Sequence, residues 1–355
     1  MDKRWKEVAD ILVNYSTEVQ PGERVMIAMR EIETLPLAKS VYQAVIRAGG
    51  FPQVQFLSDY LDHALLADGT EEQISWVPEI EAAGMEWADV YIALRGAHNI
   101  YEFADIASDK IAVYRQAMGK ISSLRWENTR WCIIRVPNEQ FAQQAETDVE
   151  TIMDLFFNAT IRDYEQESIR LSKFTELLNK GSHVRLVGKD TDLNFSIEDR
   201  KWLAGTGKLN LPDGEIFTAP VNSTLNGYIS FEWPGVLGGR LVSDIKLAWE
   251  DGEMIHASAS DNEDFLLKIL ASDPGAKLLG EFAIGTNQEI NRFCKDIFFD
   301  EKIGGTVHIA LGRAYPECGG KNQSAIHWDI IKDTREEGTI FLDGEPIFSQ
   351  GKFLI

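Results

Sequence analysis

The strongest constraint on the fold is a change in the hydrophobic pattern near the middle of the chain. In the first half, short apolar runs such as 24–29 and 88–95 alternate with segments whose apolar residues recur at helical spacing, such as 5–19 and 35–48. Strands separated by helices imply right-handed crossovers and a parallel sheet. The first half is therefore predicted to be an α/β domain with a parallel sheet.

The second half has a different pattern. After a long helical segment at 147–178, short β-like runs follow one another, and Gly or Asp-Gly turns separate several of them. The runs lie at 183–187, 193–197, 215–219, 227–231, 245–249 and 253–259. We expect a mixed, β-rich α+β domain, with a helix at 261–270. The predicted domains are 1–180 and 181–355.

Composition excludes several classes of protein. With 355 residues, of which 44% are hydrophobic and 26% charged, the chain can bury a sizeable core. Its net charge of −21 repels phosphate backbones, so we expect no nucleic-acid and no membrane partner. No stretch approaches the ~20 apolar residues of a membrane helix. Three scattered cysteines suit a reducing compartment, which predicts a cytoplasmic protein.

The first candidate for chemistry is the run Ile-His-Trp-Asp-Ile-Ile at 326–331. His327 and Asp329 stand at i and i+2, so a strand would point both side chains to the same face. A cation there would compensate the desolvation of the carboxylate. A His–Asp hydrogen bond on a half-exposed strand explains the tripeptide equally well. His308, central in a glycine-bounded β run at 304–312, favours the cation.

Two glutamates stand in comparable settings. Glu215 begins a β run after an Asp-Gly turn, and Glu281 is the single charge in an apolar, glycine-bounded run. Each could pair with a Lys or Arg instead. Together with His308, His327 and Asp329, they form a mixed oxygen and nitrogen set that suits Zn²⁺, Co²⁺ or Mn²⁺ better than Ca²⁺ or Mg²⁺. Such a set is sufficient for a two-metal hydrolytic centre.

Four segments, in this order, resemble the aminopeptidase T/S family of dinuclear metallo-aminopeptidases, the thermophilic aminopeptidase family. They are Asn-Leu-Pro-Asp-Gly-Glu-Ile-Phe-Thr-Ala-Pro at 210–220, Leu-Gly-Glu-Phe-Ala-Ile-Gly at 279–285, Phe-Asp-Glu-Lys-Ile-Gly-Gly-Thr-Val-His-Ile-Ala-Leu-Gly at 299–312 and His-Trp-Asp at 327–329. The resemblance covers most of the chain and is faint at the N-terminus. It implies a two-domain fold, a homodimer and a peptide substrate.

The resemblance also implies a site with two divalent metal ions. Its ligands would be Glu215, Glu281, His308, Tyr315, His327 and Asp329. Glu281 and Glu301 become candidate catalytic carboxylates for proton transfer, and Tyr315 a candidate ligand or oxyanion donor. From the residues alone, Tyr315 is better explained as a packed or hydrogen-bonding aromatic side chain.

The chain departs from the family pattern between Tyr315 and His327, which only the short connection 316–326 joins, so it is a short member. The leading prediction is a metal-dependent aminopeptidase that activates water with two metals. The short connection motivates a second hypothesis, a metal-dependent amidase acting on a non-peptide substrate. A third hypothesis is a non-catalytic binding protein stabilised by a closed structural metal site.

Overall fold

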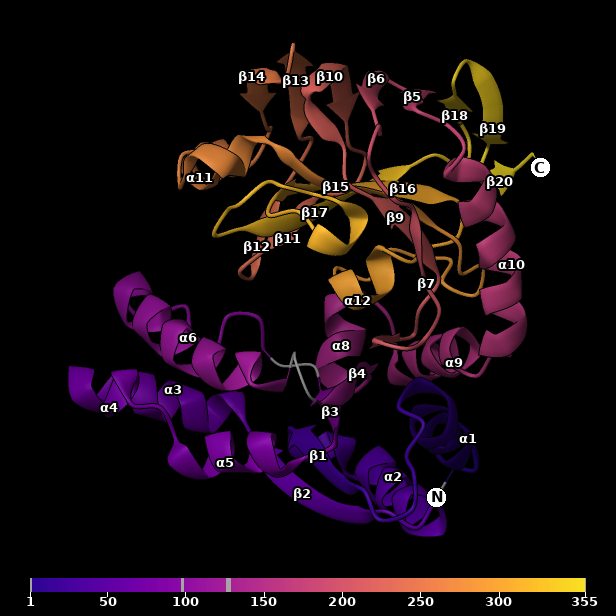
Figure 1. The fold of residues 1–355 in the computed structure, drawn as a ribbon. Coiled ribbons are helices and arrows are strands. Elements are labelled where there is room, and N and C mark those ends of the chain that lie inside the picture. The colour runs from indigo at the N-terminus through magenta and orange to yellow at the C-terminus, as the bar shows by residue number, and fades with distance from the viewer. Residues whose placement is uncertain (1, 97–98, 126–128, 355) are drawn as a thin grey trace. The chain divides into compact units, whose positions relative to one another are not determined.

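The computed structural model describes residues 2–96, 99–125 and 129–354 (Figure 1). These residues form two compact units. One comprises Met1–Arg162 and Gly207–Pro212, and the other Asp163–Thr206 and Asp213–Ile355. The folding domains 1–180 and 181–355 remain our proposal. Among the described residues, no helix is both long and apolar enough to cross a bilayer.

The first unit contains a five-stranded sheet in the order β2-β1-β3-β4-β8, and all of its pairings are parallel. Its strands are β1 (Arg24–Arg30), β2 (Phe51–Leu57), β3 (Val90–Gly96), β4 (Arg130–Val136) and β8 (Asn210–Leu211). The predicted α/β architecture is confirmed. The two-residue β8 comes from a segment far along the chain, which the local pattern did not assign to this sheet.

Helices precede and connect these strands, as the alternating pattern predicts. They are α1 (Arg4–Ile11), the π-helical η1 (Leu12–Ser16), the 3₁₀ turn η2 (Ile32–Thr34), α2 (Leu35–Arg47), α3 (Asp59–Asp68), α4 (Glu71–Ser75), α5 (Glu79–Trp87), α6 (Ser108–Ser123), α8 (Glu139–Gln144) and α9 (Val149–Thr160). The expected helix over 147–178 is two helices, because the chain breaks after Thr160. Asp163 then accepts a hydrogen bond from the Gln166 amide and caps α10 (Tyr164–Leu178).

The second unit is β-rich, as predicted. An antiparallel sheet has the order β14-β13-β10-β6-β5-β18-β19-β20. Its strands are β5 (His183–Gly188), β6 (Thr191–Ser196), β10 (Val221–Ser230), β13 (Lys246–Glu250), β14 (Glu253–Ser258), β18 (Gly338–Leu342), β19 (Glu345–Ser349) and β20 (Lys352–Phe353).

A second antiparallel sheet has the order β17-β16-β15-β9-β7. Its strands are β7 (Leu203–Gly205), β9 (Glu215–Thr218), β15 (Leu279–Gly285), β16 (Thr306–Gly312) and β17 (His327–Asp333). The remaining elements are the hairpin β11 (Gly235–Leu237) and β12 (Arg240–Val242), helices α11 (Glu263–Leu270) and α12 (Ile297–Asp300), and the 3₁₀ turns η3 (Pro274–Lys277) and η4 (Pro316–Cys318).

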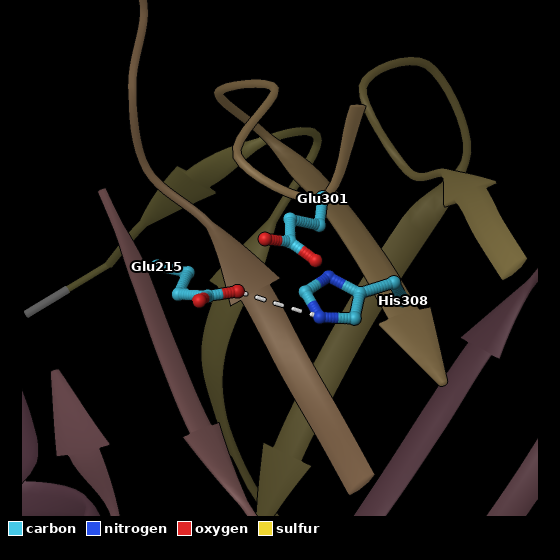
Figure 2. Close-up of side chains that lie close together, drawn as sticks. All are labelled: Glu215, Glu301 and His308. Atoms are coloured by element: carbon cyan, nitrogen blue, oxygen red, sulfur yellow. Dashed lines mark ion pairs between the residues drawn. The ribbon is translucent and has the colours of Figure 1, made fainter. Parts of the chain in front are cut away.

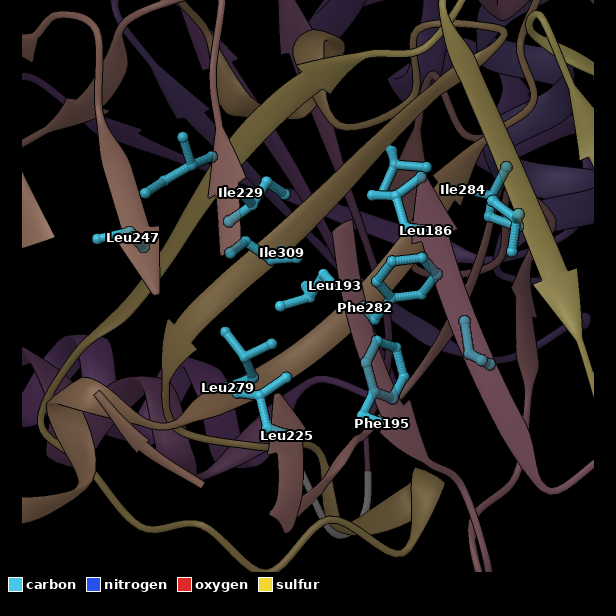
Figure 3. Close-up of a cluster of buried hydrophobic side chains, with 14 of the residues drawn as sticks. Leu186, Leu193, Phe195, Leu225, Ile229, Leu247, Leu279, Phe282, Ile284 and Ile309 are labelled. Carbon is cyan, nitrogen blue, oxygen red and sulfur yellow. The ribbon is translucent and has the colours of Figure 1, made fainter. Parts of the chain in front are cut away.

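The core of this unit joins residues from both sheets (Figure 3). Leu193 and Phe195 of β6 and Phe282 of β15 are fully buried, and the Phe195 and Phe282 rings pack edge to face with centroids 5.1 Å apart. Ile309 of β16 belongs to the same cluster. Apolar packing thereby occupies one face of the antiparallel sheet β17-β16-β15-β9-β7. The polar residues of this sheet must therefore lie on its other face.

Candidate metal centre

In the antiparallel sheet β17-β16-β15-β9-β7, successive side chains of a strand point to opposite faces, and this alternation separates apolar from polar side chains. On β15, Phe282 and Ile284 enter the core, whereas Glu281 occupies the alternate position. On β16, Ile309 enters the core and His308 alternates with it. The same alternation holds on β9 and β17. One face therefore gathers Glu215, Glu281, His308, His327 and Asp329.

The strand register brings these polar residues to neighbouring positions. Glu281 pairs with Ala310, which pairs in turn with Asp329, and His308 pairs with Ala283 of β15. The two alanines carry only a methyl group, so they leave space between the longer polar side chains. A register shift in β15 immediately precedes Glu281. Such bulges are frequent beside active sites, where they re-aim a side chain.

Both histidines approach one carboxylate. Glu281 Oε1 lies 3.7 Å from His308 Nε2, and Glu281 Oε2 lies 3.3 Å from His327 Nε2. The same His327 nitrogen is 3.4 Å from Asp329 Oδ1. Residues that are 46 positions apart along the chain, Glu281 and His327, are therefore direct neighbours in the fold.

The side chains form two groups, each with three potential ligand atoms within 4.8 Å of one another. The first group is Glu215, Glu301 and His308 (Figure 2), and the second is Glu281, His327 and Asp329. Within the first, Glu215 Oε2 is 3.4 Å from His308 Nε2. Glu301 comes from the C-terminal end of α12 rather than from the sheet. Because Glu281 also approaches His308, the two groups are contiguous.

Tyr315 lies beside this cluster. It follows β16, and its ring centroid is 5.0 Å from that of His327 and 5.8 Å from that of Phe217. Burial, together with the neighbouring Glu281 and Asp329 carboxylates, raises the pKa of its phenol. The structure thus brings all seven sequence-predicted site residues into one region of the second unit.

Sequence reasoning missed Lys302. Its side chain is fully buried, and its Nζ forms an ion pair with Glu301 and lies 3.6 Å from Glu215 Oε1. These two carboxylates raise the lysine pKa despite burial, which opposes the charged form. The position of Lys302 directly after Glu301, in the Asp-Glu-Lys segment, is the one sequence feature that could have indicated a role at the site. Nothing in the local sequence distinguishes Lys302 from a surface lysine.

Burial and mutual attraction shift the ionisation of the cluster. Burial raises the pKa of Glu215 well above its ordinary value. For Glu281, burial acts in the same direction, but His308 and His327 outweigh it and lower the pKa. Burial works against protonated imidazoles, yet the surrounding carboxylates raise the pKa of His308 to about 9 and that of His327 to about 11. The cluster thus stabilises positive charge at its centre.

Unsatisfied polar atoms test whether a metal fits these residues. Among the described residues, Nδ1 and Nε2 of His308 and Oδ1 of Asp329 are buried without a hydrogen-bond partner. Buried polar atoms are seldom left unpaired, because each loses its hydration. Imidazole nitrogens and carboxylate oxygens are also the donors that transition-metal ions accept. The residues present therefore fit one or more divalent metal ions.

The fold and this donor set indicate a metal-binding protein whose site lies on one sheet face of a β-rich unit. Comparison with known families gives the particular class. The family described as thermophilic metalloprotease (M29) matches residues 1–353. The chain belongs to this family.

Curated relatives agree with the family. The chain is 24% identical to aminopeptidase 2 of Geobacillus stearothermophilus in an alignment of 408 positions, gaps included, which covers 99% of this chain and 98% of the relative. It is also 24% identical to aminopeptidase T of Thermus thermophilus, with the same coverages. Both alignments are longer than this chain, so the relatives carry residues with no counterpart here. This agrees with the expectation of a short member.

Solved structures agree on the fold. Wild-type AmpT from Thermus thermophilus has a TM-score of 0.88, with 24% identity and 99% coverage of each chain. A 2,5-dihydroxypyridine dioxygenase from Pseudomonas putida KT2440 has a TM-score of 0.63 at 13% identity, covering 99% of this chain and 96% of its own. One architecture therefore carries different chemistries, and the fold alone does not define the reaction.

These comparisons confirm the predicted resemblance and the predicted enzyme class, a metal-dependent peptidase of the aminopeptidase family. The amidase and the non-catalytic binding protein are not favoured, since the named relatives are aminopeptidases. Use of divalent metal follows from the family description.

Proposed function

We propose that this protein removes N-terminal residues from peptides by means of two divalent metal ions. The observation that carries the proposal is the position of Glu281, whose two carboxylate oxygens face two different histidines. A carboxylate with one oxygen toward each of two ligand groups can bridge two cations. Two-metal hydrolases use such a pair to bind both the attacking and the leaving atoms.

The two groups of side chains supply the ligands in this proposal. Glu215 and His308 would hold one ion, His327 and Asp329 would hold the other, and Glu281 would be shared by both. Tyr315 adds a phenol oxygen beside His327. The mixture of imidazole and carboxylate donors favours Zn²⁺, Co²⁺ or Mn²⁺. When bound, the metal pair supplies Lewis acidity and lowers the pKa of a water for attack on the scissile carbonyl.

Glu301 is the group that we assign to proton transfer. It reaches the cluster from α12, whereas the proposed ligands on β9, β15, β16 and β17 come from the sheet. Its carboxylate can accept a proton from the nucleophilic water and deliver it to the leaving amine. The ion pair with Lys302 fixes its orientation. We assign Tyr315 the stabilisation of the negative oxygen of the tetrahedral species as the alternative to its role as a ligand.

Cleavage at a free N-terminus requires recognition of an α-amine. In this proposal one of the two metal ions would bind the neutral α-amine of the substrate, and an acylated nitrogen could not replace it as a donor. The family relatives are named aminopeptidases, which supports the same substrate class for this chain. The short connection at 316–326 follows Tyr315, so we place the difference in substrate preference from longer members there.

We infer a homodimer from the family resemblance. A cytoplasmic location is supported by the three cysteines, which are all buried and free of disulfides.

The decisive experiment combines elemental analysis with hydrolysis of three matched substrates: an aminoacyl-anilide, its N-acetylated form and an acyl amide without an α-amine. We expect two metal equivalents per chain and hydrolysis of the first substrate alone. Hydrolysis of the acetylated substrate or of the acyl amide would reject the exopeptidase. A single equivalent in fully active protein would reject the two-metal arrangement.

A further inference from the structure

Glu301, to which we assign proton transfer, follows a very short helix. Helix α12 has four residues, Ile297–Asp300, and Glu301 is its C-terminal capping residue, with helical dihedral angles. A single helical turn is not stable by itself, because fixing its residues costs more conformational entropy than its first hydrogen bond offsets. Contacts from outside the turn must therefore fix α12, and with it the direction in which the Glu301 side chain leaves the backbone.

The chain after Glu301 is held by Asn287. The Asn287 amide donates to the Lys302 carbonyl oxygen at 3.1 Å, and the Gly304 amide donates to the Asn287 carbonyl oxygen at 2.9 Å. Asn287 is itself fully buried, and its side-chain amide donates to the Asp213 carbonyl oxygen at 2.9 Å. This side of Glu301 is therefore tied to the Asp-Gly turn that precedes β9.

The chain before Glu301 is held by the side chain of Asp300. Its Oδ1 accepts a hydrogen bond from the Cys294 amide at 2.6 Å, and its Oδ2 accepts one from the Asp296 amide at 2.8 Å. Lys295, between the two donors, has a φ of +59°. A left-handed residue turns the neighbouring amides toward a common point, where they form a concave site for a carboxylate. Asp300 thus closes this segment into a ring that ends at Glu301.

Asp300 is placed to hold the backbone rather than to contact a substrate. The residue is 2% exposed, and both of its carboxylate oxygens accept main-chain hydrogen bonds. Burial raises the pKa of this carboxyl well above its ordinary value, whereas the amides of Cys294 and Asp296 oppose that shift. The number and direction of its acceptor atoms match the two donors. An asparagine of the same shape offers one acceptor and would turn its NH₂ group toward the second amide.

We propose that Asp300 is a positioning residue of the reaction: it anchors the turn of α12 and thereby directs the Glu301 carboxylate toward His308 (Figure 2). The inference rests on the proposed function, in which Glu301 transfers the proton. Proton transfer needs a fixed geometry, and a displacement of about 1 Å can lower a rate about 10²-fold. Asp300 therefore acts through Glu301.

A double-mutant cycle, measured by anilide hydrolysis and elemental analysis, tests this role. Asp300→Asn should lower kcat about 10- to 10²-fold and leave KM and the metal content unchanged, because no ligand and no substrate contact is altered. In the Glu301→Gln background the same substitution should cause no further loss, because the group through which Asp300 acts is already gone. Losses that multiply in the double variant would overturn the proposal. A lost metal equivalent in Asp300→Asn would do the same.

Asp343→Asn is the matched control. Asp343 also accepts main-chain hydrogen bonds, from the amides of Ser182 and His183, but it lies in the turn between β18 and β19. Its substitution should leave kcat unchanged. If Asp300→Asn does not fold, as judged by circular dichroism, Asp300→Glu replaces it, since this variant keeps both acceptor oxygens and displaces them by one methylene. It should show the same loss of kcat, and again no further loss in the Glu301→Gln background.

The outcomes separate this inference from the proposed function. If Glu301→Gln lowers kcat and the folded Asp300 variant does not, Glu301 transfers the proton without help from Asp300, and the inference alone is wrong. If Glu301→Gln retains the full kcat, the proposed proton transfer is wrong, and the inference is wrong with it.

Discussion

His327 is held by the backbone of Arg313: its Nδ1 lies 2.7 Å from the Arg313 carbonyl oxygen. A carbonyl can only accept, so Nδ1 carries the hydrogen and Nε2 faces Glu281 and Asp329 with its lone pair available when the imidazole is neutral. Metal-ligating histidines are commonly oriented in this way by a backbone carbonyl. The contact fixes both the tautomer and the direction of the ring.

From this arrangement we predict that His327→Ala lowers the metal content by one equivalent and kcat by at least about 10²-fold, as loss of a catalytic ligand requires. The measurement is elemental analysis together with anilide hydrolysis. His183→Ala, which alters an exposed histidine on β5, is the matched control and should leave both values unchanged. Full metal content in His327→Ala would remove this residue from the ligand set.

Glu281→Gln keeps the size of the side chain but removes the charge that both histidines face. We expect kcat to fall by about 10²–10⁴-fold, because a neutral amide cannot bridge two cations or move a proton. Glu345→Gln, at an exposed position of β19, serves as its control. Turnover near the wild-type rate, with metal bound and the fold intact, would contradict the bridging role.

Glu301→Gln distinguishes a proton carrier from a ligand. If Glu301 transfers protons, the variant retains two metal equivalents and loses about 10²–10⁴-fold in kcat, with little change in KM. The pH profile of kcat should lose the limb that this carboxyl controls. Loss of one metal equivalent would instead make Glu301 a ligand, which its position beside Glu215 and His308 also permits geometrically.

Lys302→Met should destabilise the metal-free protein more strongly than the metal-loaded protein. The buried ammonium faces Glu215 and Glu301, and removing one partner of a buried ion pair costs about 3–5 kcal/mol. Added Zn²⁺ or Co²⁺ should recover part of this loss, because the cation replaces the missing positive charge. Urea unfolding with and without chelator measures both quantities. An equal loss in metal-loaded and metal-free protein would exclude electrostatic coupling between Lys302 and the centre.

Acid stability should depend on Asp89. Hydrogen bonds from Arg24 lower the pKa of this carboxyl from 3.8 to about 2, so the ionised form is the one that folding favours. Its contribution is present above about pH 4 and is lost as the pH falls toward 2. The stability difference between wild type and Asp89→Asn should therefore shrink over that interval. A constant difference across the interval would refute the assignment.

The predictability of the fold varied with the range of the interactions involved. The runs at 24–29 and 88–95 became strands β1 and β3 within two residues at each end, because each is a continuous local signal. Strand β8 could not be foreseen, since two residues at 210–211 have no pattern of their own and join the sheet only through β4. The break between α9 and α10 was also missed, although Asp163 is an ordinary capping residue.

For the candidate site too, local features could be predicted from the sequence and long-range contacts could not. Sequence alone determined the residue types and their alternation: a histidine, an aspartate or a glutamate at every second position of an apolar strand must share a face, since the strand period is two. It did not determine which strands are neighbours. Only the tertiary structure set the order β17-β16-β15-β9, placed Glu281 between His308 and His327, and brought in Lys302 from outside the sheet. Strand pairing and burial join residues far apart along the chain, and no local pattern encodes those distances.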